Sequence, residues 1–247
     1  FSVAETPGQT PFNPLLIYSN PGLGKTHLLQ AIGNCLLQKK PNMRVVYITS
    51  EKFMQEFISA IQKNKSTDFA QTYRNVDLLL LDDAQFFQNK EQTQEQFFHL
   101  FNDLYQRGKQ LVLTTDRHPN ELKGIKDRLI SRFQSGLIVD IQAPDLETRI
   151  AILVKQAEDD SLDIPYDVTE FIAFSVKNDI RRMKAVLIRL LAFSSIKHVD
   201  ITMEMAKQVL IDMLGKSAFN RVNINHVIKY VSKTMKVSER QLFAKGR

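Results

Sequence analysis

Residues 15–29 read LLIYSNPGLGKTHLL, an apolar run followed by a glycine-rich loop and then a helix-like pattern. The apolar run has the length of a β-strand, and apolar residues return at helical spacing after Thr26. In such a loop the backbone N–H groups turn inward, and the positive end of the following helix points at the same place. The stretch therefore predicts an α/β fold with a phosphate-binding loop.

The loop ends in Gly24-Lys25-Thr26, the second half of the pattern G-x-x-x-x-G-K-[ST]. In that pattern the lysine reaches the β and γ phosphates and the hydroxyl binds Mg²⁺. Ser19 replaces the first glycine, and because serine does not adopt positive φ cheaply, we expect an altered entry into the loop. A plain Gly-Pro turn is disfavoured, since Lys25 would then be an unexplained cation at a helix start. We expect ATP or ADP to contact Asn20, Pro21, Gly22, Leu23, Gly24, Lys25, Thr26 and His27.

Composition indicates a globular protein of 247 residues with 43% hydrophobic content and a formal net charge of +6. This charge favours polyanionic partners but identifies none. No apolar run approaches the roughly 20 residues of a membrane helix and no targeting segment is recognisable, so a cytoplasmic location is expected. A single cysteine, Cys35, excludes an internal disulfide.

The pattern of strands and helices changes at Ala143. Before it, five apolar runs separated mostly by helical patterns predict an α/β domain over residues 1–143, a five-stranded parallel sheet with flanking helices. After it, helical spacing alone predicts a smaller all-helical lid domain over residues 144–217. Residues 218–247 are expected to form a linker helix and the beginning of a further element that continues beyond Arg247.

Acidic residues end two of the expected strands. Asp82 and Asp83 follow LLLL, where Asp82 would hold Mg²⁺ and Asp83 would act as the base that orients water. Asp116 ends the run LVLTTD and would position water or sense the γ-phosphate. Two solvated acids in a turn, and a helix-capping turn at Asp116, remain the alternatives.

Arginines at two further places favour phosphate recognition. Arg128 and Arg132 lie four residues apart and therefore share one helix face. There they would either reach the nucleotide of a neighbouring subunit or form surface ion pairs. Arg181 opens the longest helix of the lid domain and would point back at the phosphates, unless it is an ordinary solvated residue. Arg182 is expected to face solvent.

Five segments together resemble AAA+ ATPases, and within them the branch of bacterial replication initiators. They read GLGKTHLLQAIGN, LLLLDDAQFFQNKEQTQEQFFHLFN, LVLTTDRHPNEL, RLISRFQSGLIVDIQAPDLETRIAIL and IRRMKAVLIRLLAFSS. The resemblance implies a slowly hydrolysing ATP switch that self-assembles and engages single-stranded origin DNA. It also implies roles for Asp116 as sensor 1, Arg132 as the arginine finger and Arg181 as sensor 2.

The same resemblance implies a helical insertion at residues 50–75, which would wedge neighbouring subunits into a filament. Ser50 is expected to cap the first helix of this insertion. The resemblance places single-stranded DNA against Ile58, Lys90 and Thr93, while Gln92 stands where relatives often have arginine, which removes one phosphate contact. Duplex DNA would be bound only by the domain beyond Arg247. A replicative helicase and acidic membrane lipid are further implied partners.

Two alternatives remain open at this point. A helicase-loading or transposition-helper ATPase would share the phosphate loop and the fold. A regulatory module that binds nucleotide without hydrolysing it would follow if Ser19 compromised the loop. The complete set of carboxylates and arginines favours the enzyme.

Overall fold

The computed structural model describes residues 2–9 and 11–215. The chain divides into two compact units, Phe1–Ala143 and Pro144–Arg247, and each is described by itself. The linker helix expected over residues 218–247 lies outside the described residues.

The first unit contains a five-stranded parallel sheet, as expected. Its strands are β1 (Leu15–Tyr18), β2 (Val45–Thr49), β3 (Leu78–Asp82), β4 (Gln110–Thr115) and β5 (Leu137–Asp140). Their order across the sheet is β2-β3-β4-β1-β5, and all neighbours pair in parallel. The carboxyl ends of β1, β3 and β4 are therefore adjacent, at the edge where open parallel sheets bind ligands.

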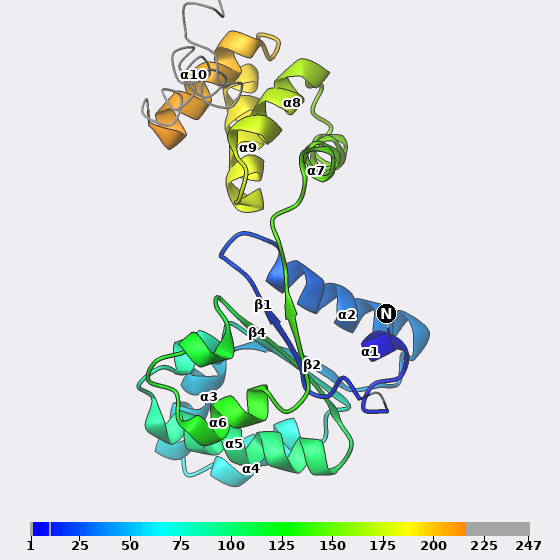
Figure 1. Ribbon diagram of the computed structural model, residues 1–247, viewed down its shortest axis with the longest axis vertical. Coiled ribbons are helices and arrows are strands. Elements are labelled where there is room, and N and C mark those ends of the chain that lie inside the picture. Colours follow the sequence, from blue (N-terminus) through cyan, green and yellow to red (C-terminus); the bar gives the residue numbers. More distant parts are fainter. Residues whose placement is uncertain (1, 10, 216–247) are drawn as a thin grey trace, which may run out of the picture. The chain divides into compact units, whose positions relative to one another are not determined.

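Helices cover both faces of this sheet (Figure 1). One face carries α1 (Ser2–Glu5) and α2 (Lys25–Lys39), while the helices after β2 lie on the other: α3 (Ser50–Gln62), α4 (Ser66–Arg74), η1 (Ala84–Phe87), α5 (Glu91–Gln106), η2 (Pro119–Glu121) and α6 (Asp127–Phe133). Alternate side chains of β3 serve the two faces, because Leu78 and Leu80 pack into the core under α2, whereas Leu79 and Leu81 pack under α3–α6.

The pair α3 and α4 occupies the place between β2 and β3 where the insertion was expected. Phe53 of α3 is fully buried, and its ring centroid lies 5.2–5.9 Å from those of Phe69, Tyr73, Phe87 and Phe97. These rings belong to α4, η1 and α5, so aromatic packing joins the insertion to the sheet unit. Ser50 was expected to cap α3, but Thr49 is the cap, because its side chain accepts from the Lys52 amide.

The second unit consists of helices in its described part. They are α7 (Leu146–Asp159), α8 (Tyr166–Ser175), α9 (Ile180–Lys197) and α10 (Met203–Leu214). Asp145, Asp179 and Thr202 cap three of them, and Leu153, Ile172, Leu187 and Val209 lie in one buried core. Within residues 2–9 and 11–215, no helix combines the length and the apolar character that a bilayer crossing requires.

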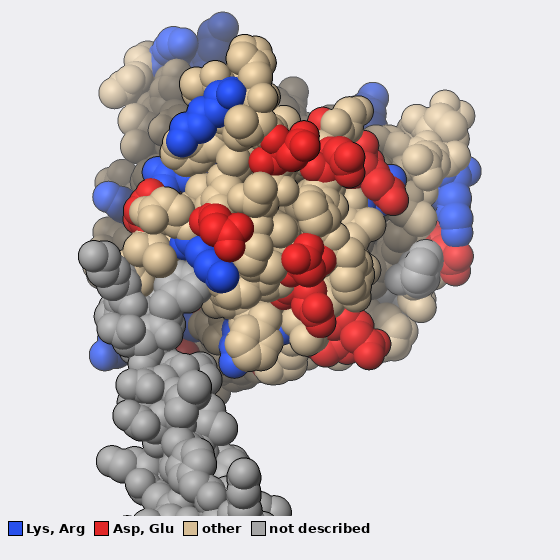
Figure 2. All heavy atoms as spheres, turned by 90° about the horizontal axis from the view of Figure 1, so that it is seen from above, with Lys and Arg blue, Asp and Glu red and all other residues tan. Residues whose placement is uncertain are grey.

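The face of the molecule drawn in Figure 2 carries both basic and acidic side chains. Figure 2 shows one face, seen from above, on which Asp and Glu side chains gather in several groups. The formal charge of +6 does not make this face a basic surface. Net charge alone is therefore a poor guide to where a polyanion binds, and the site must be sought in particular residues.

Candidate nucleotide-binding site

The loop between β1 and α2 places its left-handed backbone on glycines. Gly22 has φ of 86° and Gly24 of 93°, and an added Cβ at Gly24 would meet no atom within 4 Å, so backbone conformation and not space requires this glycine. Ser19 is not among the positive-φ residues of the described chain. The serine therefore imposes no left-handed strain on the loop entry, contrary to the concern raised by its position in the motif.

Lys25 is folded against this loop. Its side chain is largely buried, and Nζ donates to the Ser19 carbonyl oxygen at 2.8 Å and lies 3.3 Å from Ser19 Oγ and the Asn20 carbonyl oxygen. The N-cap residue of α2 is Gly24, which has no side chain. It therefore leaves the amides of the first turn of α2 uncapped. An ammonium group and helix amides thus meet where an anion binds.

Asp82 is the best-connected acid of the site. Its Oδ2 accepts from Thr26 Oγ1 at 2.7 Å and from the Tyr47 hydroxyl at 3.0 Å, and its Oδ1 accepts from Thr114 Oγ1. The carboxylate is 2% exposed. Burial, and then the charge of Asp82, raise the pKa of Tyr47 to about 12, so the phenol stays a donor at neutral pH.

Thr26 and Asp82 together fit a magnesium ion. Mg²⁺ prefers hard oxygen ligands and is usually held by one or two carboxylates together with the phosphates of the substrate. The hydroxyl and carboxylate oxygens of this pair come from different elements, α2 and β3, yet lie 2.7 Å apart. The donor set therefore suits the ion that the motif implies.

Asp83 leaves the strand in a left-handed turn, with φ of 57°. Its N–H donates to Thr114 Oγ1 at 2.8 Å, and its Oδ1 accepts from Gln85 Nε2 at 2.9 Å. Ser50 Oγ lies 3.0 Å and 2.9 Å from the carbonyl oxygens of Asp82 and Asp83. Neighbouring elements thus hold both the turn and the Asp83 carboxylate in place.

Asp116 is held by its neighbour Arg117, which donates from Nε to Oδ1 at 2.9 Å and from Nη2 to Oδ2 at 2.7 Å. This pairing is the main cause that holds the pKa of the Asp116 carboxyl below its ordinary value, and the charge of Lys25 contributes. The Asp116 N–H donates to Gln85 Oε1 at 3.2 Å, so Gln85 bridges Asp83 and Asp116.

Sequence reasoning missed Tyr47 and Gln85, and it assigned Ser50 only a capping role. Tyr47 lies near the end of an expected strand, and Gln85 follows the acidic pair closely. Their positions near strand ends were the signal in the sequence that could have assigned them to the site. Tyr47, however, lies 35 positions from Asp82, and only the sheet register brings the two residues together.

The two arginines of α6 differ in their contacts. Arg128 forms an ion pair with Glu95 and stacks 4.8 Å from the centroid of Phe98. Arg132 is half-buried, and its guanidinium has no ion pair or hydrogen bond to any side chain in the described part of the chain. The ion-pair reading therefore holds for Arg128, whereas Arg132 stays available to a ligand.

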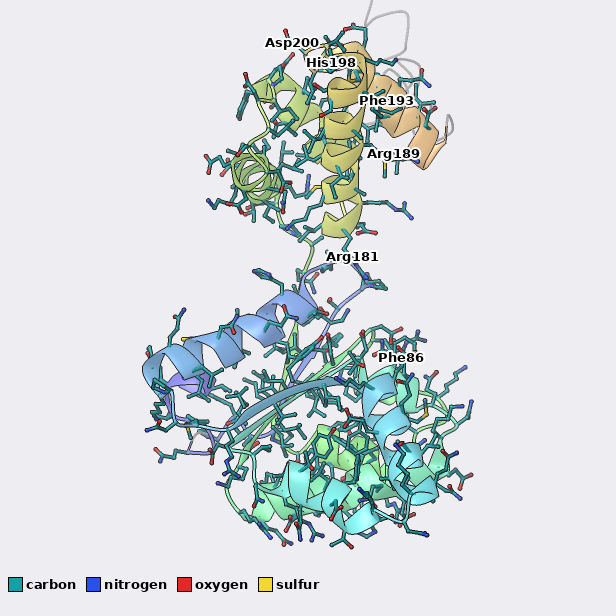
Figure 3. The ribbon with its side chains drawn as sticks, turned by 180° about the vertical axis from the view of Figure 1, so that it is seen from behind. Phe86, Arg181, Arg189, Phe193, His198 and Asp200 are labelled. Carbon is teal, nitrogen blue, oxygen red and sulfur yellow. The ribbon has the colours of Figure 1, made fainter. Side chains whose placement is uncertain are left out.

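Arg181 and Arg182 differ in the same way. Both are exposed, but Arg182 lies 3.7 Å from Asp179, whereas Arg181 makes no ion pair within residues 2–9 and 11–215. Figure 3 shows Arg181 in the first turn of α9, far along the helix from Phe193. Of the two residues, Arg181 is the one without an internal partner among the described carboxylates.

The three residues expected to contact single-stranded DNA differ in their exposure to solvent. Ile58 is 45% exposed, and Lys90 and Gln92 are exposed as well. Burial contradicts the prediction that Thr93 contacts DNA, because its side chain lies on the inner face of α5 and is only 4% exposed. A buried threonine offers no side-chain contact to a strand at the surface.

Comparisons with known proteins identify the family of this chain. The bacterial DnaA ATPase domain family matches residues 1–140. Domain III of the Thermotoga maritima replication initiation protein DnaA is 42% identical with a TM-score of 0.82, over 85% of this chain and 88% of that one. AMPPCP-bound DnaA from Aquifex aeolicus is 38% identical with a TM-score of 0.70, over 79% of this chain and 60% of that one.

A third structure, the replication initiator DnaA bound to AMPPCP and single-stranded DNA, is 32% identical with a TM-score of 0.68. The alignment covers 100% of this chain and 71% of that one. The family match spans more than half of the chain, and it coincides with the strands, loop and carboxylates described above. The chain therefore belongs to the bacterial DnaA ATPase family, the AAA+ ATPases of replication initiators, and it is an ATPase.

Proposed function

We propose that this chain binds ATP with Mg²⁺ at the loop between β1 and α2 and uses the bound triphosphate as a switch. The ATP-bound form assembles with copies of itself and engages single-stranded origin DNA, and slow hydrolysis reverses assembly. The relatives solved with AMPPCP and with single-stranded DNA support this assignment. The expected cytoplasmic location and the contacts with helicase and acidic lipid stay predictions.

The phosphate groups would be held by Lys25 and by the backbone of residues 20–27. Thr26 and Asp82 would hold Mg²⁺, which neutralises negative charge on the phosphate oxygens when it is bound. Asp83 would orient the attacking water and accept its proton, while Asp116 would sense the γ-phosphate. Gln85 would keep Asp83 and Asp116 in register, because it bonds to both.

The observation that carries the switch is the contrast within α6. Arg128 is already paired with Glu95, whereas Arg132, four residues later, has no carboxylate partner among the described residues. An unpaired guanidinium on a short helix suits a phosphate that arrives on another subunit, because arginine fingers act on the charge of the transferring phosphoryl group. In the same manner Arg181 would contribute a cation from the helical unit.

Strand binding would involve Ile58 of α3 and Lys90 at the start of α5. Lys90 supplies a phosphate contact and Ile58 supplies exposed apolar surface. Gln92 lacks the charge of arginine, so the salt dependence of binding is expected to be lower by about one unit of slope than with arginine. Thr93 takes no part because it is buried.

The matched variants Arg132→Ala and Arg128→Ala test the proposal. Arg132→Ala should bind ATP as the unaltered chain does, while sedimentation shows no ATP-dependent assembly and turnover in the assembled state falls by about 10³-fold. Arg128→Ala should keep both properties. Loss of ATP binding by monomeric Arg132→Ala protein would contradict a role across the subunit interface.

A further inference from the structure

Tyr47 contributes a hydroxyl to the carboxylate that the proposed function assigns to magnesium. The phenol donates to Asp82 Oδ2 at 3.0 Å, the same oxygen that accepts from Thr26 Oγ1 at 2.7 Å. Asp82 Oδ1 is taken by Thr114. Both oxygens of this buried carboxylate are therefore fixed by hydroxyl donors from three different elements.

Sheet register explains why a tyrosine at this position reaches Asp82. Tyr47 pairs with Leu80 across β2 and β3, and Leu80 faces the core under α2. Asp82 lies two residues further along β3 and shares that face. A long side chain on β2 thus spans the diagonal to Asp82, beside the first turns of α2 that carry Thr26.

A bound metal ion would affect the two hydrogen bonds to Asp82 Oδ2, from Thr26 and from Tyr47, in different ways. A metal ion held by Thr26 and Asp82 would take the place of the hydrogen bond between these two side chains. A carboxylate oxygen has a second lone pair, and the bond from Tyr47 uses it without competing with the ion. Tyr47 is then the donor that still orients Oδ2 when the metal is present.

We propose that Tyr47 is a positioning residue that holds the Asp82 carboxylate in the orientation required for Mg²⁺, an inference that rests on the proposed metal site. Hydrogen-bond partners of metal ligands typically change metal affinity by about 10- to 100-fold when they are removed. Tyr47 is 39% exposed. We therefore place the expected effect at the lower end of that range.

Tyr47→Phe removes the hydroxyl and keeps the ring, so the fold is expected to persist. Tyr105→Phe is the matched control, because Tyr105 is also 39% exposed and its hydroxyl makes no hydrogen bond to the described residues. AMPPCP affinity of the whole chain is titrated against Mg²⁺ concentration and again in EDTA. Tyr47→Phe should raise the half-saturating Mg²⁺ concentration about tenfold and leave the affinity in EDTA unchanged.

Thr26→Val separates failure of this inference from failure of the metal site. If Thr26→Val raises the half-saturating Mg²⁺ concentration while Tyr47→Phe behaves as Tyr105→Phe does, the positioning role is wrong. An equal loss of affinity in Mg²⁺ and in EDTA for Tyr47→Phe would also overturn it. If Thr26→Val has no effect either, the metal site is wrong and the role of Tyr47 falls with it.

Discussion

The carboxyl edge of the sheet and the outward arginines of α6 and α9 differ in how their polar groups are satisfied. At the edge, Asp82 accepts from three hydroxyls and Asp116 is held bidentately by Arg117. On the helices, Arg132 and Arg181 have no ion pair to any carboxylate in the described part of the chain.

This difference separates polar side chains that find their partners within the folded chain from those whose partners would be a ligand or a second subunit. Buried polar groups must be paired when the chain folds, because an unpaired one costs about 1–3 kcal/mol. Arginine side chains that solvent reaches, such as the exposed Arg181 and the half-buried Arg132, carry a smaller penalty, because water can solvate them. Under the proposed function the carboxylates at the sheet edge are held in place before nucleotide binds, whereas the arginines acquire their partner only when ATP and a second subunit arrive.

The largest effect should come from the aromatic packing that fixes the insertion beside the preformed edge. Phe53→Ala removes a fully buried ring and is expected to lower the free energy of unfolding by about 3–5 kcal/mol. Ile58→Ala, on the same helix but 45% exposed, should cost about 0.5 kcal/mol or less. Urea unfolding measures both, and similar losses would show that the insertion is not anchored through Phe53.

A smaller loss is expected when one hydroxyl of the edge is removed. Thr114→Val deprives Asp82 Oδ1 of a donor and the Asp83 N–H of an acceptor, at a cost of about 1–3 kcal/mol in unfolding free energy. Thr72→Val is the control, because Thr72 only donates to the Asp68 carbonyl oxygen on an exposed helix. Equal thermal stability of the two variants would mean that the edge is not internally satisfied.

Arg117→Ala should have a smaller effect that depends on pH. Because Arg117 lowers the pKa of Asp116 in the folded chain, their pairing stabilises the fold above the unfolded pKa near 3.8 and is lost as pH falls through the folded value. Because the Arg117 side chain is exposed to solvent, the pair contributes only weakly to stability at pH 7. Urea titrations at pH 7 and pH 2.5 test this, and a destabilisation that grows toward acid pH would contradict it.

The smallest effect on stability should come from the outward arginines. Arg132→Ala and Arg181→Ala are each expected to change the unfolding free energy by less than about 0.5 kcal/mol in the absence of nucleotide, since neither breaks an internal ion pair in the described chain. Thermal melts check this. A loss above about 1 kcal/mol would place these arginines with the edge and remove the contrast between the two regions.

The sequence by itself determined the α/β unit, its five strands, the phosphate loop and the helical unit that follows. These features depend on local patterns, namely apolar periodicity and the glycines that precede Lys25. It also located Asp82, Asp83 and Asp116, because a carboxylate after an apolar strand falls at the carboxyl edge of the sheet.

Only the tertiary structure decided which side chains meet these acids. The order β2-β3-β4-β1-β5 brings Tyr47 and Thr26 to Asp82 across 35 and 56 positions of sequence. Packing, likewise, turned Thr93 inward and paired Arg128 rather than Arg132. Register and packing act between residues that are distant in the chain, and a local pattern carries no record of which of them become neighbours.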